Sequence, residues 1–155
     1  MVGAISSHLP VMFVDIRPAE IRNVKNLSLL DGSLLALPVL DNSIKSLSCM
    51  HFVEYIGLGY YGDPLDPMGT IKAIKELIRI LAPKGELFFS APIGVSRLCI
   101  NAHRIRSVDR ILEMFSELEL LEFSYVNDTD QYILNADPTR IEELIYGCGL
   151  FLFRK

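Results

Sequence analysis

Short apolar runs alternate with amphipathic segments along this chain. Residues 11–16 form an apolar run that a proline closes, which is typical of a strand buried on both faces. Residues 27–30 and residues 44–50 are bounded by turn-forming residues, so the pattern predicts two more strands. We expect the first of the three to be a central strand of a parallel sheet.

Helical periodicity follows these strands. Asp66 is a typical capping residue, Pro67 suits the first helical position, and the predicted helix ends before Pro83 and Gly85. A second helix is predicted from a Ser107 cap through Phe115. The apolar stripe of the first helix consists of Ile71, Ile74, Leu77, Ile78 and Leu81.

The rest of the chain continues the alternation. Strands are predicted at residues 86–91 and 121–126, a short helix at residues 137–147 and a last strand at residues 150–153. Strands that alternate with helices predict an α/β fold. The chain contains no internal repeat or linker, so we expect a single domain over residues 1–155.

Polar residues stand at the ends of the predicted strands, where ligands bind in open α/β sheets. They are Asp15, Asp31, His51 and Ser90. A carboxylate at such a position accepts hydrogen bonds from two ribose hydroxyls, each contributing about 1.5–3 kcal/mol. Asp15 and Asp31 on successive strands favour a nucleoside-like pocket, and the alternative is that each caps a turn.

Composition narrows the class of protein. The 155 residues carry 15 Lys+Arg and 19 Asp+Glu, a net charge of −4, and half of them are hydrophobic. We therefore expect a globular, cytoplasmic protein that binds neither nucleic acid nor membranes. A basic group suits an anionic substrate, although we favour an ordinary surface for it: Arg97, Arg104, Arg106 and Arg110.

The three cysteines are far apart and form no C-x-x-C pair. We expect reduced, buried thiols at Cys49, Cys99 and Cys148. Cys99 and Cys148 have apolar neighbours in the sequence and are interpreted as small hydrophobic residues. A catalytic thiol is the minor alternative.

One G-x-G-x-x-G pattern occurs, from Gly57 to Gly62. A dinucleotide site needs this pattern to follow a strand directly and to open a helix. Six residues separate it from the strand and a proline follows it, so we disfavour a dehydrogenase. The segment is either a plain glycine-rich loop or a substrate-binding lid that carries Tyr60 and Tyr61.

His51, Glu54 and His103 are candidates for general acid–base chemistry or metal binding. His51 and Glu54 share a face only if their segment is helical, and H-x-x-E without a second nearby histidine is not a zinc-protease motif. We predict no metal site, and a metal-dependent hydrolase stays the third functional alternative. Asn101 and Arg104 lie in a polar loop suited to a substrate.

Longer patterns suggest a family. They are D-G at 31–32, L-P at 37–38, D-N-S at 41–43, H-F-V-E-Y-I at 51–56 and E-L-I-R-I-L-A-P-K-G at 76–85. In order and spacing they resemble the middle of class I S-adenosylmethionine-dependent methyltransferases. Residues 11–126 also resemble a group of domains of unknown function marked by V-D-I-R-P (14–18), H-x-x-E-x-I-G-L-G-x-Y-G-D-P (51–64) and N-A-H-R (101–104).

The resemblance implies roles for single residues. Asp15 would bind the ribose of S-adenosylmethionine, and Asp31 would lie near adenine, with Gly32 and Ser33 beside it. His51 would face the transferred methyl group or its acceptor, and we add Glu54 and His103 as catalytic candidates. The acceptor, a small molecule or a glycan, is expected to contact Tyr60, Tyr61, Asp63, Asn101 and Arg104.

The chain departs from the methyltransferase pattern. Lys45 and Lys84 stand where the superfamily usually has Asp and Gly. Ten residues precede Val11, too few for the strand and helix that carry the superfamily's glycine-rich loop. We therefore expect a Rossmann-like sheet lacking most of its first strand–helix unit. We favour residues 1–10 as a makeshift strand, with pairing of the flanking strands or a homodimer as alternatives.

Two functions remain open. One is a methyltransferase-like protein that uses S-adenosylmethionine. The other is a catalytically inactive relic of that fold, a pseudoenzyme that serves as a binding or interaction module. The retained carboxylates favour the first, and the absent glycine-rich loop favours the second.

Overall fold

The computed structural model describes residues 2–17, 21, 23–60, 64–99, 103–141 and 144–155. The chain forms two compact units, Met1–Pro38 and Val39–Lys155. The expectation of a single domain stays a prediction.

The first unit contains a short helix and a pair of parallel strands. Helix α1 spans Val2–Ser6, and strands β1 (Val11–Asp15) and β2 (Leu27–Asp31) pair in register from Val11–Leu27 to Asp15–Asp31. The makeshift strand predicted for residues 1–10 was wrong. Val2–Ser6 form a short helix instead, and Ser6 and Ser7 donate side-chain hydrogen bonds back to the carbonyls of Gly3 and Ala4.

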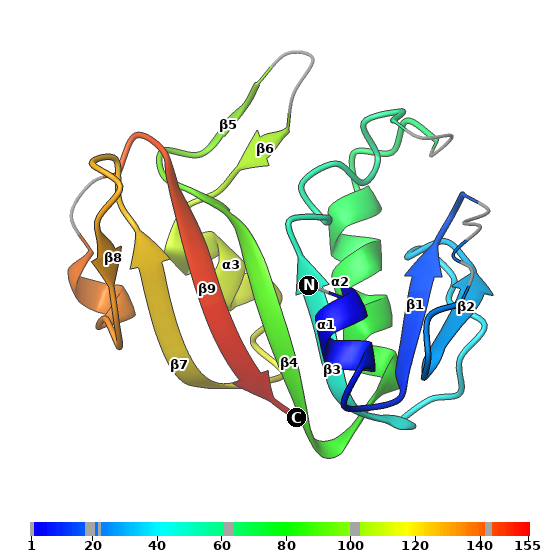
Figure 1. Ribbon diagram of the computed structural model, residues 1–155. Coiled ribbons are helices and arrows are strands. Elements are labelled where there is room, and N and C mark those ends of the chain that lie inside the picture. The colour runs from blue at the N-terminus through cyan, green and yellow to red at the C-terminus, as the bar shows by residue number, and fades with distance from the viewer. Residues whose placement is uncertain (1, 18–20, 22, 61–63, 100–102, 142–143) are drawn as a thin grey trace. The chain divides into compact units, whose positions relative to one another are not determined.

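The second unit contains a sheet of five strands in the order β3-β4-β9-β7-β8 (Figure 1). β3 and β4 are parallel, and β9 lies antiparallel between β4 and β7. The carboxyl ends of β3 and β4 and the start of β9 therefore share one edge of the sheet. The strands are β3 (Ile44–Met50), β4 (Leu81–Ile93), β7 (Glu119–Val126), β8 (Tyr132–Ile133) and β9 (Gly147–Arg154).

Two helices lie behind this sheet in the view of Figure 1. α2 spans Gly69–Ile80, and α3 spans Val108–Met114 after the Ser107 cap, which accepts a hydrogen bond from the Arg110 amide. The predicted stripe of α2 is confirmed at Ile74, Leu77 and Ile78, which are buried, whereas its last member, Leu81, is the first residue of β4. The predicted start was two residues early, because Asp66 caps the turn before the helix by accepting from the Met68 amide.

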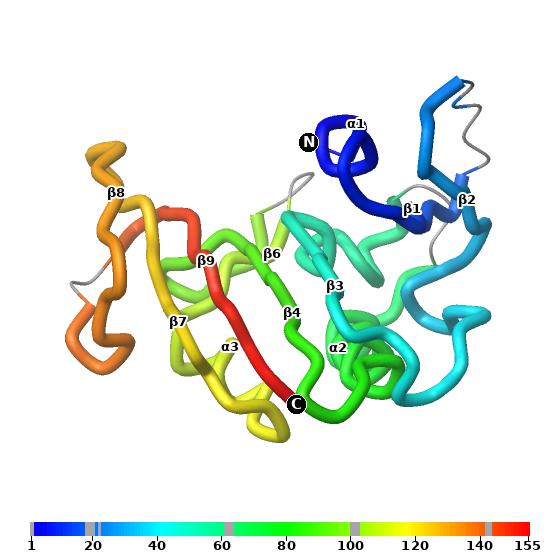
Figure 2. Tube along the Cα trace, turned by 60° about the horizontal axis from the view of Figure 1, so that its bottom comes forward, coloured from blue at the N-terminus to red at the C-terminus, as the bar shows by residue number. Residues whose placement is uncertain are grey.

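The core of the second unit is aromatic. β9 alternates buried and partly exposed residues along its length, as expected for a strand with two different faces. Figure 2 shows it in the middle of the sheet, between β4 and β7. The buried rings that meet there belong to Phe89, Phe115, Phe123, Phe151 and Phe153.

The smaller elements differ most from the prediction. β5 (Arg97–Leu98) and β6 (Arg104–Ile105) form a two-stranded ribbon that the sequence pattern missed. The helix predicted over residues 137–147 was wrong: its described part contains the 3-10 turn η1 (Pro138–Arg140), and Gly147 opens β9. The amides of Ile145 and Tyr146 donate to the Asp128 carboxylate, so they are not available for a helical ladder.

Lys84 adopts the left-handed backbone conformation, with φ of 62°. A side chain costs about 1–2 kcal/mol in that conformation, and glycine avoids this cost while losing more entropy on folding. We expect Lys84→Gly to raise the free energy of unfolding by about 0.5–1 kcal/mol in urea denaturation. Lys75→Gly, on the exposed side of α2, is the control and should lower it by about 1 kcal/mol. A loss of stability in both variants would contradict the argument.

Candidate functional site

His51 stands directly after β3, at the carboxyl edge of the sheet. Its amide donates to the Ser90 carbonyl of β4 at 3.0 Å, and its backbone takes the left-handed conformation with φ of 49°. Such a conformation is uncommon for a residue other than glycine and turns the chain sharply out of the strand. The imidazole is 44% exposed.

Glu54 is brought back to His51 by a tight turn. The amides of Tyr55 and Ile56 donate to the carbonyls three residues earlier, at Phe52 and Val53. The turn places Glu54 Oε1 3.2 Å from His51 Nδ1, while the carboxylate is 1% exposed. The sequence argument required a helix for these two side chains to share a face; the segment is a turn and not a helix, and the turn brings the two side chains together.

Cys148 completes the cluster and was not identified as a member of it from the sequence. Its Sγ lies 3.1 Å from His51 Nε2. The expectation of a buried, purely apolar thiol was wrong at Cys148 and at Cys99, since both are partly exposed, and right at Cys49. No sequence signal links His51 to Cys148, because 97 residues separate them and the register of β9 alone brings them together.

The electrostatics of this cluster favour a proton on the imidazole. Hydrogen bonds to Cys148 and then to Glu54 raise the pKa of His51 to about 10, against the opposing effect of partial burial. His51 thus carries its proton at neutral pH and is not a free general base. Burial, with the nearby Glu54 charge, raises the pKa of Cys49 to about 12, so that thiol stays protonated.

Two arginines lie close to the buried carboxylate. Arg104 and Arg106 line, with Glu54, a cavity of about 10 Å³, which is roughly the room that one water molecule needs. Burial lowers the pKa of Arg106 to about 10. Within the described residues Glu54 Oε2 has no hydrogen-bond partner, although it is buried.

The remaining predicted catalytic and substrate residues of this unit lie around the same loops. His103 packs edge-on against Tyr55, with ring centroids 6.0 Å apart, and Tyr60 packs against the same ring at 6.2 Å. His103 Nε2 is buried and has no hydrogen-bond partner in the part of the chain that is described. Arg104 donates to the Ile56 carbonyl and fastens the loop there. Three predicted substrate residues fall outside the described residues: Tyr61, Asp63 and Asn101.

The basic group behaves mainly as a set of structural contacts. Arg97 donates a hydrogen bond to the Ile145 carbonyl, and Arg104 donates to the Ile56 carbonyl. Arg110 forms an ion pair with Glu113. The described ranges contain no group of three or more His, Cys, Asp or Glu side chains arranged to hold a metal ion.

The predicted nucleoside residues lie in the first unit. Asp15 and Asp31 are register partners at the carboxyl ends of β1 and β2. Arg17 holds the pKa of Asp15 below its usual range through side-chain and backbone hydrogen bonds. Gly32 donates its amide to the Asp15 carbonyl, and the Ser33 hydroxyl accepts from the Leu35 amide.

A family model described as "Caenorhabditis protein of unknown function, DUF268" matches residues 39–144. The match spans more than half of the chain, and the chain belongs to this family. It includes the segments from His51 to Pro64 and from Asn101 to Arg104, whereas the segment at residues 14–18 precedes it.

Solved structures give the class of fold. An S-adenosylmethionine-dependent methyltransferase from Methanosarcina mazei has a TM-score of 0.65 and 12% identity, covering 99% of this chain and 85% of that one. The N-methyltransferase NodS from Bradyrhizobium japonicum, solved with S-adenosyl-L-homocysteine, has a TM-score of 0.61 and 16% identity, covering 99% and 71%. This chain therefore has the Rossmann-like methyltransferase fold.

This chain is shorter than some of the proteins whose fold it shares, and it then matches only part of their length. The [4+2]-cyclase SpnF has a TM-score of 0.58 and 14% identity, covering 84% of this chain, and the chain spans 57% of its length. No curated protein is similar enough in sequence to count as a match. Among the described residues no helix is long and apolar enough to cross a membrane.

Proposed function

We propose that this protein is an S-adenosylmethionine-dependent methyltransferase that acts on a small molecule or a glycan. The observation that carries the proposal is the pair of carboxylates, Asp15 and Asp31, aligned at the carboxyl ends of two parallel strands in a methyltransferase fold. Parallel α/β sheets bind ligands beyond these ends. Two carboxylates side by side suit the hydroxyl groups and the amino group of a nucleoside.

The residues fit the cofactor in part. Asp15 is partly buried and its oxygens would accept hydrogen bonds from ribose, while Asp31 is exposed beside it. The cofactor would supply a methyl group on a sulfonium, and the protein's part is then mainly to hold the acceptor in line with that methyl group.

A specific contact favours the alternative of a non-catalytic binding module. Arg17 Nε lies 3.3 Å from Asp15 Oδ1 and Arg17 Nη2 lies 3.4 Å from Oδ2, so the guanidinium engages both carboxylate oxygens. Ribose hydroxyls would compete with this exposed arginine for the same oxygens. A protein that has lost cofactor binding is expected to neutralise Asp15 in this way.

Titration calorimetry with S-adenosylhomocysteine distinguishes the two functions. We expect saturable binding to the wild-type protein and a loss of about 10- to 100-fold in affinity for Asp15→Asn, because a hydrogen bond to a charged group contributes about 1.5–3 kcal/mol. Arg17→Ala should bind at least as tightly as the wild type, since it removes the competing guanidinium.

Glu117→Gln is the matched control, because Glu117 is an exposed carboxylate outside the first unit and its loss should leave the affinity unchanged. Absence of saturable binding up to millimolar ligand, in the wild type and in Arg17→Ala, would overturn the methyltransferase proposal. That result would favour the binding module.

A further inference from the structure

The cluster at the sheet edge joins a thiol, an imidazole and a carboxylate in one chain of contacts. Cys148 Sγ lies 3.1 Å from His51 Nε2, and His51 Nδ1 lies 3.2 Å from Glu54 Oε1. A nucleophile within reach of a base that a third group orients is the arrangement that activates thiols and hydroxyls in proteins. The methyltransferase proposal makes no use of Cys148.

We propose that Cys148 is a nucleophilic thiol that forms mixed disulfides with small disulfide compounds. His51 activates the thiol, and Glu54 orients the imidazole of His51. When both imidazole nitrogens carry hydrogen, Nδ1 donates to the carboxylate and Nε2 donates to sulfur. An N–H that points at the sulfur stabilises the negative charge that the sulfur carries when it attacks. The raised pKa of His51 agrees with this distribution of the proton.

The thiol is held by rigid surroundings. Cys148 pairs with Pro92 on β4 and with Val126 on β7, so neighbouring strands flank it on both sides. Gly147 and Gly149 lie on either side of it in the chain, and a Cβ at either position would meet other atoms at 2.5–2.6 Å. Cys148 is nevertheless partly exposed, and His51 is 44% exposed, so a small reagent has access to the pair.

Glu54 fixes the imidazole from the buried side. The carboxylate is 1% exposed, and its Oε2 atom has no partner within the described residues. Placing this charge in the protein interior is costly unless a cation faces it. His51 is the cation in direct contact, and Arg104 and Arg106 line the same cavity.

The other two cysteines provide references inside the same molecule. Cys49 is buried, and its raised pKa keeps it an unreactive thiol. Cys99 is partly exposed like Cys148, and its amide donates a hydrogen bond to the His103 carbonyl. A difference in rate between Cys148 and Cys99 therefore reports the effect of the imidazole rather than of exposure.

The reaction is an exchange that balances without a further oxidant. The Cys148 thiolate attacks one sulfur of a small disulfide, the new S–S bond forms, and the old S–S bond breaks. The departing thiolate takes a proton from solvent. The added disulfide is itself reduced to one free thiol for each Cys148 that becomes a mixed disulfide.

Peptide-resolved mass spectrometry tests the proposal with bis(2-hydroxyethyl) disulfide as the probe on the whole protein. At pH 7 we expect modification of Cys148 about tenfold faster than modification of Cys99. His51→Gln should slow Cys148 about tenfold and leave Cys99 unchanged. Glu54→Gln should slow Cys148 by a smaller factor, about threefold, since the amide still contacts the ring.

A pH series separates activation from a merely structural role. The groups that face the sulfur and its imidazole are Glu54, Arg104 and Arg106 together with His51 itself. Between pH 8.5 and pH 6.5 we expect the ratio of the Cys148 rate to the Cys99 rate to rise, because of the two thiols it is Cys148 that contacts the imidazole of His51. Glu54→Gln should make the pH dependence of the modification rate at Cys148 more like that at Cys99.

Cys49 shows whether each variant is folded, because it becomes reactive only if the core opens. If a variant unfolds, the ratio of the modification rates of Cys148 and Cys99 in the wild-type protein still tests the proposal. A wild-type Cys148 that reacts no faster than Cys99 overturns the proposal, as does an unchanged Cys148 rate in a folded His51→Gln protein. These outcomes are independent of S-adenosylhomocysteine binding, so this proposal and the methyltransferase proposal can fail separately.

Discussion

Replacement of Gly57 by alanine is expected to lower the free energy of unfolding by roughly 2–5 kcal/mol. Gly57 has φ of 76°, and a Cβ there would lie 2.0 Å from the Asp66 carbonyl oxygen. The Gly57 carbonyl also accepts a hydrogen bond from the Asp66 amide, so the two backbones cannot separate without losing the contact that closes the loop. The unfavourable conformation and the backbone clash therefore add. Urea denaturation measures the effect.

Gly59→Ala is the matched control for this prediction. Gly59 has nearly the same φ, 77°, but its Cβ would meet only the Leu65 side chain, at 3.3 Å. This variant should cost about 1–2 kcal/mol, the share due to backbone conformation alone. Equal losses in the two variants would show that the clash with Asp66 is relieved at little cost.

The contrast explains the G-x-G-x-x-G pattern in physical terms. Gly57 allows a close approach of two backbone segments, and the helix that follows begins at Gly69, well beyond the pattern. The sequence context was sufficient to disfavour a dinucleotide site. It did not indicate that Gly57 would contact the turn at Asp66, because that contact depends on how the loop closes.

Elements with strong periodic patterns were predictable. The stripe of α2 and the Ser107 cap of α3 lie where the sequence indicates, since both depend on neighbouring residues. The errors occur where a distant partner decides the structure. The Asp128 carboxylate accepts hydrogen bonds from the amides of Ile145 and Tyr146, which a helix would have paired with its own carbonyls.

The candidate site was predictable to the same degree. His51 and Glu54 are three residues apart, and a local turn brings them together. Cys148 joins them only through the pairing of β9 with β4, which no local pattern encodes. The positions of Asp15 and Asp31 at strand ends were predicted from the sequence and are confirmed, whereas their role in binding a nucleoside stays a proposal.

Phe151→Ala is the second substitution with a large expected effect, a loss of about 3–5 kcal/mol in the free energy of unfolding. The ring is 3% exposed, and its centroid lies 4.8 Å from that of Phe123 and 5.7 Å from that of Phe153. Removing it leaves a cavity between β9 and β7 that the surrounding rings cannot fill without leaving their preferred side-chain conformations. Urea denaturation of the purified variant measures the loss.

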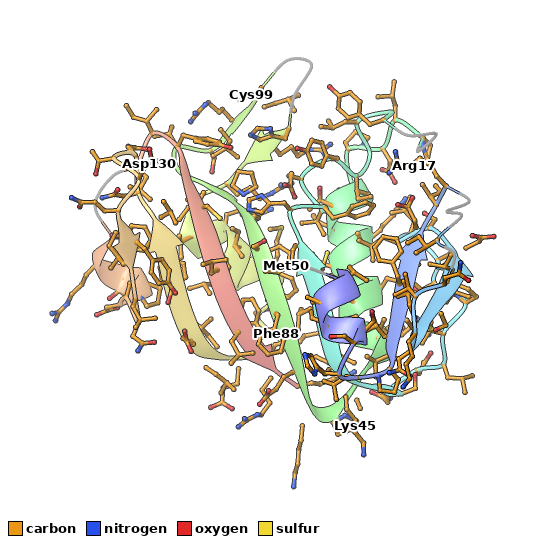
Figure 3. All side chains as sticks on the ribbon, viewed as in Figure 1. Arg17, Lys45, Met50, Phe88, Cys99 and Asp130 are labelled. Carbon is orange, nitrogen blue, oxygen red and sulfur yellow. The ribbon has the colours of Figure 1, made fainter. Side chains whose placement is uncertain are left out.

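Phe88→Ala provides the comparison within the same sheet. Phe88 lies on β4 (Figure 3). It is 44% exposed, and along that strand it faces the opposite side from the buried Phe89. Its loss should cost about 1 kcal/mol, because nearly half of the residue's surface stays in contact with water in the folded protein. A Phe88→Ala protein as unstable as Phe151→Ala would mean that this side of the sheet is covered in solution, and the aromatic cluster around Phe151 would then not be the main core of the unit.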